Sequence, residues 1–257
     1  MIKKNKIIGV IPAHLSSVRF PRKILHSFLG LPMIEHVRRR ALLAKNSSDV
    51  YVATCDNEIE IILEKFGANV IRTSSLHKNG TSRVAEAIEN IKCSHVVLLQ
   101  GDEPLILPDQ IDDFVKSMNN YAQSIAWNAT APLLSNEELD KDSFVKCILS
   151  NDDNISFFCR KSPFLSKFTE QKQIIRKVMG IIGYEKNFLL KLVKLPPSIV
   201  ETLESIEQAR IIDNGFKVRS VDIKTAMPSV NYFEEAEIVH KQMQKDLKQK
   251  EIIKKIL

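Results

Sequence analysis

The sequence has few cysteines, and their spacing excludes the sites that cysteines usually build. The 257 residues contain Cys55, Cys93, Cys147 and Cys159, and no two of them form a C-x-x-C pair. Cysteine-based zinc sites use such closely spaced pairs, and disulfide-stapled domains are richer in cysteine. We therefore expect neither a zinc site nor a disulfide framework, which fits a reducing cytoplasm.

Long hydrophobic runs and the glycine motifs of common nucleotide folds are also missing. No apolar stretch approaches the length of a transmembrane helix, so we expect no membrane insertion. Residues 1–6 are too short, and too soon followed by a predicted strand, to form a secretory signal. Neither G-x-G-x-x-G nor G-x-x-x-x-G-K-[ST] occurs. These absences predict a cytoplasmic protein without a Rossmann fingerprint or a P-loop.

Positive charge exceeds negative charge, with 37 Lys and Arg against 31 Asp and Glu and a formal net charge of +6. This excess permits nucleic-acid binding, but a pocket for a small anion needs it as well. No RRM, helix-turn-helix or zinc-finger pattern is present, so we expect no nucleic-acid partner. The rival hypothesis is a nucleic-acid-binding or regulatory protein that uses the basic amphipathic stretch 245–255.

Segments of strand and helix type alternate in the first half of the chain. Predicted strands comprise residues 7–11, 50–53, 69–72 and 95–99. Predicted helices comprise residues 33–44, 58–66 and 84–91. This alternation is typical of a parallel sheet covered by helices on both faces. The chain, 44% hydrophobic, is long enough for one large domain or one domain with a smaller lobe.

The second half is less regular. Predicted strands comprise residues 125–132, 144–149, 179–184 and 217–221. Predicted helices comprise residues 197–210 and a terminal helix from residue 234 onward. Glu201 and Glu207 fall at helical spacing, which favours a solvated face. Arg83 is expected to be a helix-surface charge paired with Glu86.

The first predicted strand leads into a polar, cationic segment. Pro12 is expected to end the strand, and the next eleven residues contain two serines and four basic or titratable side chains, namely Ser16, Ser17, His14, Arg19, Arg22 and Lys23. Open α/β sheets bind ligands at the carboxyl ends of their parallel strands. These donors and charges suit a polyphosphate. The alternative is a set of solvated surface charges.

The fourth predicted strand is followed by Gln100-Gly101-Asp102-Glu103-Pro104. Two acids directly after a buried strand are placed like a magnesium site beside phosphates. A capped turn is the alternative interpretation.

These segments resemble motifs of the sugar nucleotidyltransferases. Residues 11–25 read I-P-A-x-x-x-S-x-R-x-P-x-K-x-L and are followed by G-x-P-M-I-x-H-V, and residues 96–104 read V-x-x-x-Q-G-D-E-P. They look like the signatures of 3-deoxy-manno-octulosonate (Kdo) cytidylyltransferases. The resemblance covers nearly the whole chain. It implies a mostly parallel Rossmann-like, GT-A-like α/β sheet with helices on both faces and a smaller sugar-binding and dimerisation lobe.

The resemblance also implies an organisation and a reaction. Residues 1–257 would form a single nucleotidyltransferase domain, with a nucleotide-binding half at 1–120, a sugar-binding and dimerisation half at 121–230 and a C-terminal helix at 231–257. A homodimeric cytoplasmic enzyme would couple CTP to an acidic sugar, giving a CMP-sugar and pyrophosphate for lipopolysaccharide or capsule synthesis.

Individual roles follow from the same resemblance. The catalytic residues would be Arg19, Lys23 and Asp102. The nucleotide-binding residues would be Pro12, Ala13, His14, Ser17, Lys23, Gly80 and Thr81. The sugar-binding residues would be Gln100, Arg160, Glu204 and Gln208. Mg²⁺ would be held by Asp102 and Asn231. For Arg160, snorkelling at the edge of a core is an alternative.

Three positions depart from the family pattern. His14 stands where the family has Arg, Val178 where it has a sugar-facing His, and Asn231 where it has a metal-binding Asp. One explanation is a cytidylyltransferase for a modified ulosonic acid such as 8-amino-Kdo, or for another sugar acid. The other is a catalytically impaired paralogue that still binds nucleotide.

Overall fold

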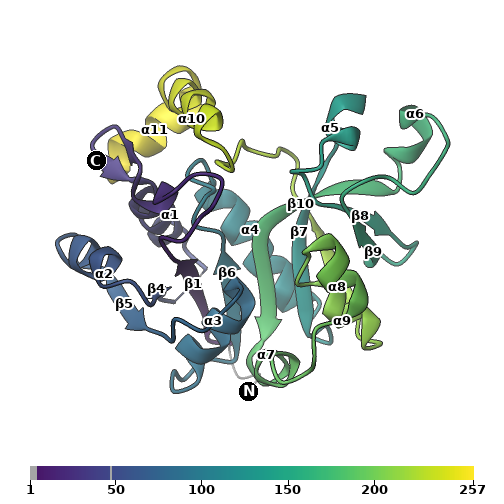
Figure 1. The fold of residues 1–257 in the computed structure, drawn as a ribbon, viewed down its shortest axis with the longest axis horizontal. Helices are drawn as coiled ribbons and strands as arrows, with labels where there is room; N and C mark the ends of the chain where they lie inside the picture. Colours follow the sequence, from purple (N-terminus) through teal and green to yellow (C-terminus); the bar gives the residue numbers. More distant parts are fainter. Residues whose placement is uncertain (1–4, 47) are drawn as a thin grey trace. The chain divides into compact units, whose positions relative to one another are not determined.

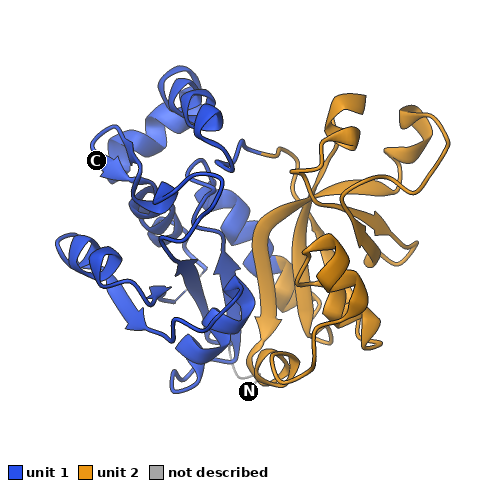
Figure 2. Cartoon of the chain, viewed as in Figure 1, with its two compact units in different colours: residues 1–116, 227–257 blue, residues 117–226 orange. Residues whose placement is uncertain are grey.

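The computed structural model of the protein describes residues 5–46 and 48–257 (Figure 1). The expectation for residues 1–6 therefore falls mostly outside the described residues. The chain divides into two compact units, one of residues 1–116 with 227–257 and one of residues 117–226 (Figure 2). The C-terminal segment thus returns to the unit that contains the N-terminal half.

The first unit is built on parallel strands that pair in the order β5–β4–β1–β6. These strands are β1 (Ile7–Ala13), β4 (Val50–Thr54), β5 (Asn69–Arg72) and β6 (His95–Leu99). β1 and β6 are almost wholly buried because apolar side chains occupy both of their faces, as in parallel sheets sandwiched by helices. The predicted strands of this half are confirmed.

Helices connect these strands and close the unit. They are α1 (Met33–Leu42), α2 (Asn57–Glu64), α3 (Gly80–Ile88), α4 (Pro108–Asn120), α10 (Phe233–Lys245) and α11 (Leu247–Ile256). Between β1 and α1 lie the short elements η1 (Lys23–Leu25), β2 (Ser27–Phe28) and β3 (Leu31–Pro32). α3 packs against β1, and α1 packs against β4. The alternation predicted from the sequence therefore gives the expected parallel α/β arrangement.

β1 does not end at Pro12, as the sequence suggested, but continues to Ala13. Pro12 lies opposite Ala53 in β4, whereas the pairing of β1 with β6 stops at Val10. The backbone N–H of Gly9 points to the β4 side, where it donates to Asp49, so Pro12, three residues later, faces the β6 side. A missing N–H there costs no ladder hydrogen bond, and the proline is tolerated.

The terminal helix expected from residue 234 onward is two helices, because Asp246 adopts an extended conformation between α10 and α11. Its carboxylate accepts a hydrogen bond from the backbone N–H of Gln249 at 2.8 Å and caps α11. The basic stretch 245–255 is part of the core on one face, where Ile252 and Ile253 are buried and the Gln249 amide donates to the carbonyl of Leu105. α11 is therefore a structural element of the first unit.

In the second unit, five strands pair in the order β10–β7–β11–β9–β8, and β8 also pairs with β10, so the pairings close into a ring. They are β7 (Ala126–Pro132), β8 (Lys146–Leu149), β9 (Asn154–Cys159), β10 (Ile175–Glu185) and β11 (Val218–Asp222). Only β7 and β11 run parallel in this ring. The short helices of this unit are α5 (Asn136–Asp140), α6 (Phe168–Gln171), α7 (Lys186–Leu192), α8 (Ile199–Glu204) and α9 (Ala209–Asp213).

The single helix predicted over 197–210 is wrong, because Ser205 has a φ of 53° and separates α8 from α9. The solvated face predicted for Glu201 is also wrong. Its carboxylate is buried and forms an ion pair with Arg210 at 2.6 Å. The Glu201 side chain also completes a capping box with Ser198 at the start of α8. Glu207 is half-buried. Glu201, an acid at helical spacing, therefore joins α8 to α9 instead of facing solvent.

Candidate active site

The Lys23 side chain joins three segments of the first unit that are far apart in sequence. Its ammonium group lies 2.5 Å from the Asp102 carboxylate and donates a hydrogen bond to the carbonyl of Val230 at 3.0 Å. The backbone N–H of Val230 donates in turn to the carbonyl of Asp102 at 2.9 Å. The side chains of Lys23 and Asp102 are 14% and 24% exposed, so both charges remain within reach of a ligand.

Gly101, next to Asp102, packs closely against β1 and the loop that follows it. A Cβ atom on Gly101 would lie 2.6 Å from the Cδ1 atom of Ile24 and 3.5 Å from the carbonyl oxygen of Pro12. Ordinary Cβ contacts are not this short, so a side chain here would push Ile24 away. The Cδ1 atom is the flexible end of the Ile24 side chain, so a rotation of that side chain is enough to make room.

The N-terminus of α3 lies beside the end of β1. A Cβ atom on Gly80 would come within 3.1 Å of the Pro12 ring, and Thr81 is 6% exposed. Asn79 caps the helix, accepting a hydrogen bond from the backbone N–H of Ser82 at 2.9 Å. The structure thus brings together two segments that the sequence assigns to nucleotide binding, at a helix end that favours anions.

The exposed His14 side chain begins the loop after β1. Its Nδ1 atom lies 2.9 Å from the Ser16 hydroxyl, and the backbone N–H of Leu15 donates to the Asp56 carboxylate at 2.9 Å. Partial desolvation by the surrounding loop, and after it the nearby Arg83 charge, lower the pKa of His14 below its usual 6.5. The imidazole is therefore more often neutral than a free histidine at the same pH.

Two residues that interact with this loop, Asp56 and Arg83, were not predicted from the sequence as residues of the site. Arg83 is buried and donates to the Thr73 hydroxyl at 2.7 Å, so its prediction as a surface charge paired with Glu86 is wrong. Glu86 instead contacts His77 and accepts from the backbone of Ser74. The sequence indicated a nucleotide role for Gly80 and Thr81, but nothing in the spacing of Arg83 indicates that it is buried.

Arg19 and Ser17 lie further along the same loop. Arg19 is exposed, and its guanidinium carbon lies 5.2 Å from the centre of the Tyr232 ring. Ser17 is half-buried. Pro12 is half-buried and Ala13 is buried at the end of β1. The residues predicted to bind nucleotide are therefore grouped at one edge of the first unit, and their individual roles stay predictions.

Asn231 follows the residue that pairs with Asp102 and Lys23. Its backbone N–H donates to the Glu235 carboxylate at 2.7 Å, and its side-chain amide donates to the Ser229 hydroxyl at 3.1 Å. Within residues 5–46 and 48–257, no group of three or more His, Cys, Asp or Glu residues is arranged to hold a metal ion. One carboxylate and one amide oxygen fit a hard cation that keeps water and phosphate ligands, as Mg²⁺ does.

The predicted sugar-binding residues fall in both units. Gln100 directly follows β6 in the first unit. In the second unit, Glu204 accepts a hydrogen bond from the backbone N–H of Arg160 at 2.9 Å, and the Arg160 Nε atom donates to the carbonyl of Glu204 at 2.7 Å. Gln208 is buried just before α9. The structure therefore brings Arg160 and Glu204 together.

The Arg160 guanidinium is strongly engaged by the backbone. Besides Glu204, it donates to the carbonyls of Asp142 at 2.9 Å and Ser205 at 3.3 Å. Its three nitrogens thus each have one backbone acceptor, and what remains for a ligand is the second N–H group on each Nη atom.

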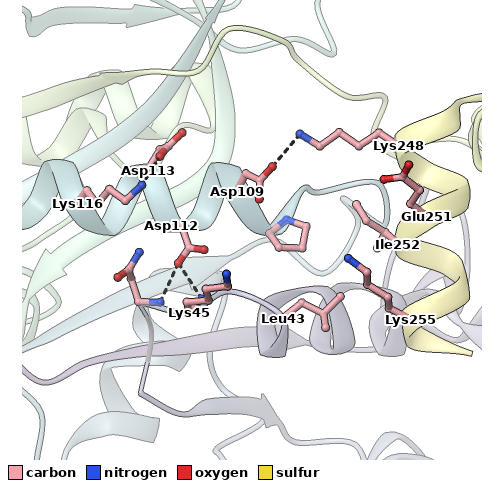
Figure 3. Close-up of a pocket in the computed structure, with 12 residues that line it drawn as sticks. Leu43, Lys45, Asp109, Asp112, Asp113, Lys116, Lys248, Glu251, Ile252 and Lys255 are labelled. Atoms are coloured by element: carbon pink, nitrogen blue, oxygen red, sulfur yellow. Dashed lines mark hydrogen bonds and ion pairs between the residues drawn. The ribbon is translucent and has the colours of Figure 1, made fainter.

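A separate pocket of about 800 Å³ lies in the first unit between the N-terminal part of α4, α11 and the residues after α1 (Figure 3). Its charges are largely matched by one another. Asp109 pairs with Lys248 at 2.9 Å, and Asp112 accepts hydrogen bonds from the backbone of Lys45 and of the following residue, both at 2.8 Å. None of the residues predicted for nucleotide or sugar lines this pocket.

Over the described part of the chain, no helix combines the length and the apolar character needed to cross a membrane.

Comparison with known proteins identifies the family. A family model described as cytidylyltransferase matches residues 8–223. A 3-deoxy-manno-octulosonate cytidylyltransferase of Chlorobium limicola is 35% identical over 244 residues, covering 94% of this chain and 98% of the relative. An 8-amino-3,8-dideoxy-manno-octulosonate cytidylyltransferase of Shewanella piezotolerans is 35% identical, covering 82% of this chain and 87% of the relative.

A solved structure is similar over the whole fold. The structure of CMP:2-keto-3-deoxy-manno-octonic acid synthetase in complex with CTP superimposes with a TM-score of 0.87 at 30% sequence identity, covering 94% of this chain and 100% of that chain. The resemblance seen in the motifs is therefore confirmed, and the chain belongs to the cytidylyltransferase family of nucleotidyltransferase enzymes.

Proposed function

We propose that the protein transfers the cytidylyl group of CTP to a 3-deoxy-ulosonic acid, Kdo or a modified relative such as 8-amino-Kdo, with release of pyrophosphate. The observation that carries the proposal is the contact among Lys23, Asp102 and Val230. It brings together a cation suited to phosphate and a carboxylate suited to a metal ion, from the segments that follow β1 and β6. Two relatives that match 94% and 82% of this chain are named as cytidylyltransferases of Kdo and of its 8-amino form.

The reaction is an in-line displacement at the α-phosphorus. The anomeric hydroxyl of the acid attacks phosphorus, its proton is lost to solvent, and pyrophosphate leaves with the electrons of the broken P–O bond. Arg19 and Lys23 neutralise the triphosphate, while Gly80 and Thr81 at the N-terminus of α3 hold the nucleoside. The protein does little covalent chemistry, so positioning and charge supply the rate.

A divalent cation, Mg²⁺, fits the oxygen donors of this site. Asp102 and Asn231 would hold it, and when bound it would supply positive charge to the reacting phosphate oxygens. Asn231 brings no charge of its own, which weakens the site relative to a second carboxylate. This substitution is the main reason to keep the impaired paralogue as an alternative.

The second unit supplies the proposed sugar contacts, through Arg160, Glu204 and Gln208, with Gln100 from the first unit. We also propose a homodimer acting in the cytoplasm, for lipopolysaccharide or capsule synthesis. α8 supports an interface, because it exposes Ile199 and Leu203 at 79% and 78%.

The test is pyrophosphate release by the pure protein with CTP and Mg²⁺, offering Kdo, 8-amino-Kdo and a nonulosonic acid in parallel. Release with Kdo or 8-amino-Kdo is the expected result and identifies the substrate. Release with the nonulosonic acid alone would replace the ulosonic acid by another sugar acid. No release with any acid, from protein that still binds CTP, would favour the impaired paralogue.

The nucleic-acid hypothesis loses its main support, because α11 is packed into the first unit. Deleting the residues after Lys245 would remove Ile252 and Ile253 from the core and expose the apolar residues that they cover. A loss of binding after this truncation could therefore come from a loss of folding. A sharper test reverses the exposed charges of Lys254 and Lys255 to Glu and measures RNA and DNA binding at two salt concentrations. We expect no specific binding before or after the change.

A further inference from the structure

The segment that enters α10 contacts the loop after β1 at successive positions. Val230 accepts the hydrogen bond from Lys23, the Tyr232 ring lies under the Arg19 guanidinium, and Phe233 packs edge-on against Phe20 at a centroid distance of 5.2 Å. Residues 230–233, which we call the strap, therefore follow the loop from Lys23 back to Arg19. All of these contacts lie within the first unit.

The strap is anchored independently of Arg19. The backbone N–H groups of Asn231 and Tyr232 both donate to the Glu235 carboxylate, at 2.7 and 3.3 Å. Val230 is fully buried and is hydrogen-bonded to Asp102. The Tyr232 ring thus projects from a backbone that is fixed at both sides, and it is 40% exposed at the surface of the loop.

Arg19 has no comparable anchor of its own. Its side chain is exposed, and among the described residues the structure gives it neither a carboxylate partner nor a hydrogen bond. A guanidinium within about 6 Å of an aromatic ring is attracted to its face. A long flexible side chain loses rotamer freedom when a ligand immobilises it, and a contact that already restricts it in the free protein reduces that cost.

We propose that Tyr232 is a positioning residue, which holds the Arg19 guanidinium at the mouth of the loop for the triphosphate of the nucleotide. The inference rests on the proposed function, since it takes CTP as the ligand of this loop. Tyr232 acts through Arg19 and need not touch the nucleotide. The aromatic ring, rather than the phenol hydroxyl, is the part that matters.

The test measures the dissociation constant of CTP by calorimetry, with Mg²⁺ and without sugar. Tyr232→Leu removes the ring and should weaken CTP binding about two- to fivefold, the usual size of an exposed cation–π contact. Tyr232→Phe keeps the ring and should bind CTP like the wild type. In an Arg19→Ala background, Tyr232→Leu should cause no further loss, because the side chain that it positions is gone.

Tyr121→Leu is the matched control. Tyr121 is 37% exposed and stacks under Arg219 at 3.9 Å in the second unit, so its removal costs a similar contact away from the loop. It should leave the CTP dissociation constant unchanged. Thermal unfolding followed by circular dichroism shows that each variant is folded.

Two results would overturn the inference while leaving the proposed function intact. One is wild-type CTP binding by Tyr232→Leu. The other is an equal loss caused by Tyr232→Leu with and without Arg19, which would mean that the ring supports the loop in general. Failure of the wild-type protein to bind CTP would instead remove the proposed function, and the inference with it.

Discussion

The ammonium group of Lys23 lies 2.5 Å from the carboxylate of Asp102, although 79 residues separate them in the sequence. In the proposed reaction both groups exchange partners, the ammonium turning to a phosphate and the carboxylate to a cation. The pair therefore keeps two opposite charges balanced in the free protein and makes both available when a triphosphate arrives. Val230 is hydrogen-bonded to both residues and so holds their segments side by side.

Lys23→Ala should lower turnover about 100-fold or more, because a positive charge placed at developing phosphate charge commonly contributes this much. The fold should be retained, since the Asp102 side chain is 24% exposed and water can solvate it. Pyrophosphate release measures turnover, and circular dichroism measures folding. The matched control is Lys116→Ala, on the solvent side of α4, which should have wild-type activity. Wild-type turnover by the Lys23 variant would show that the phosphate role is misassigned.

Asn231→Asp should strengthen binding of a divalent cation, because it adds a negative charge at nearly the same volume. The backbone there is held by Glu235, and the Ser229 hydroxyl can donate to the new carboxylate as easily as it accepts from the amide. We expect the Mg²⁺ concentration for half-maximal CTP binding or turnover to fall roughly tenfold. Asn231→Leu, which has no oxygen donor, is the control and should raise it. Unchanged Mg²⁺ dependence in both variants would exclude position 231 from the metal site.

CTP binding should depend on pH through His14. Its pKa is lowered in the free protein, and a bound polyanion favours the charged ring, so its pKa is higher in the complex. At a pH between these two pKa values, CTP binding is accompanied by the uptake of a proton by His14. The affinity for CTP therefore falls as the pH rises through this range. One added positive charge near the phosphates is expected to change the affinity on the order of fivefold.

His14→Arg and His14→Gln separate this effect from the titration of CTP itself, which is the same for all variants. The Arg variant should bind tightly at every pH, and the Gln variant weakly at every pH. Calorimetry in two buffers of different ionisation enthalpy counts the proton taken up by the wild type. The same pH dependence in all three proteins would show that His14 does not face the phosphates.

The strands of the first unit could be predicted as short apolar runs, and α1, α2 and α3 from apolar residues at helical spacing. α4 was not predicted. β5 and β6 have the predicted bounds, for example, and the motifs after β1 and β6 come together as parallel strands require. The helix breaks at Ser205 and Asp246 could not be predicted, since neither residue is a glycine or proline and both lie inside a continuous helical pattern.

Buried charged residues are the second feature of the structure that the hydrophobic pattern of the sequence does not indicate. Glu201 and Arg83 stand at exposed-looking positions in the sequence, and only their partners, Arg210 and Thr73, make their burial possible. Those partners are nine or ten residues away, beyond the reach of helical periodicity. The same holds for the contact of Arg19 with Tyr232, which depends on the return of the C-terminal segment to the first unit.

The ion pair of Glu201 with Arg210 should stabilise the second unit. Its side chains are 10% and 12% exposed, and Arg210 also donates to the carbonyl of Leu195 at 3.0 Å. Glu201→Ala leaves the Arg210 charge buried without its partner and removes the capping box at Ser198. We therefore expect a loss of about 3 kcal/mol in the free energy of unfolding, as for other buried pairs broken on one side.

Glu237→Ala is the surface control for this measurement, because Glu237 pairs with Lys241 on α10 at 2.6 Å while both side chains remain more than half exposed. Such a pair contributes little to stability, because solvent screens both charges. Denaturant unfolding at neutral pH compares the two variants with the wild type. Equal small losses in both would mean that the Glu201 carboxylate is solvated after all, whereas a large loss confined to Glu201→Ala shows that this acid serves the fold rather than a ligand.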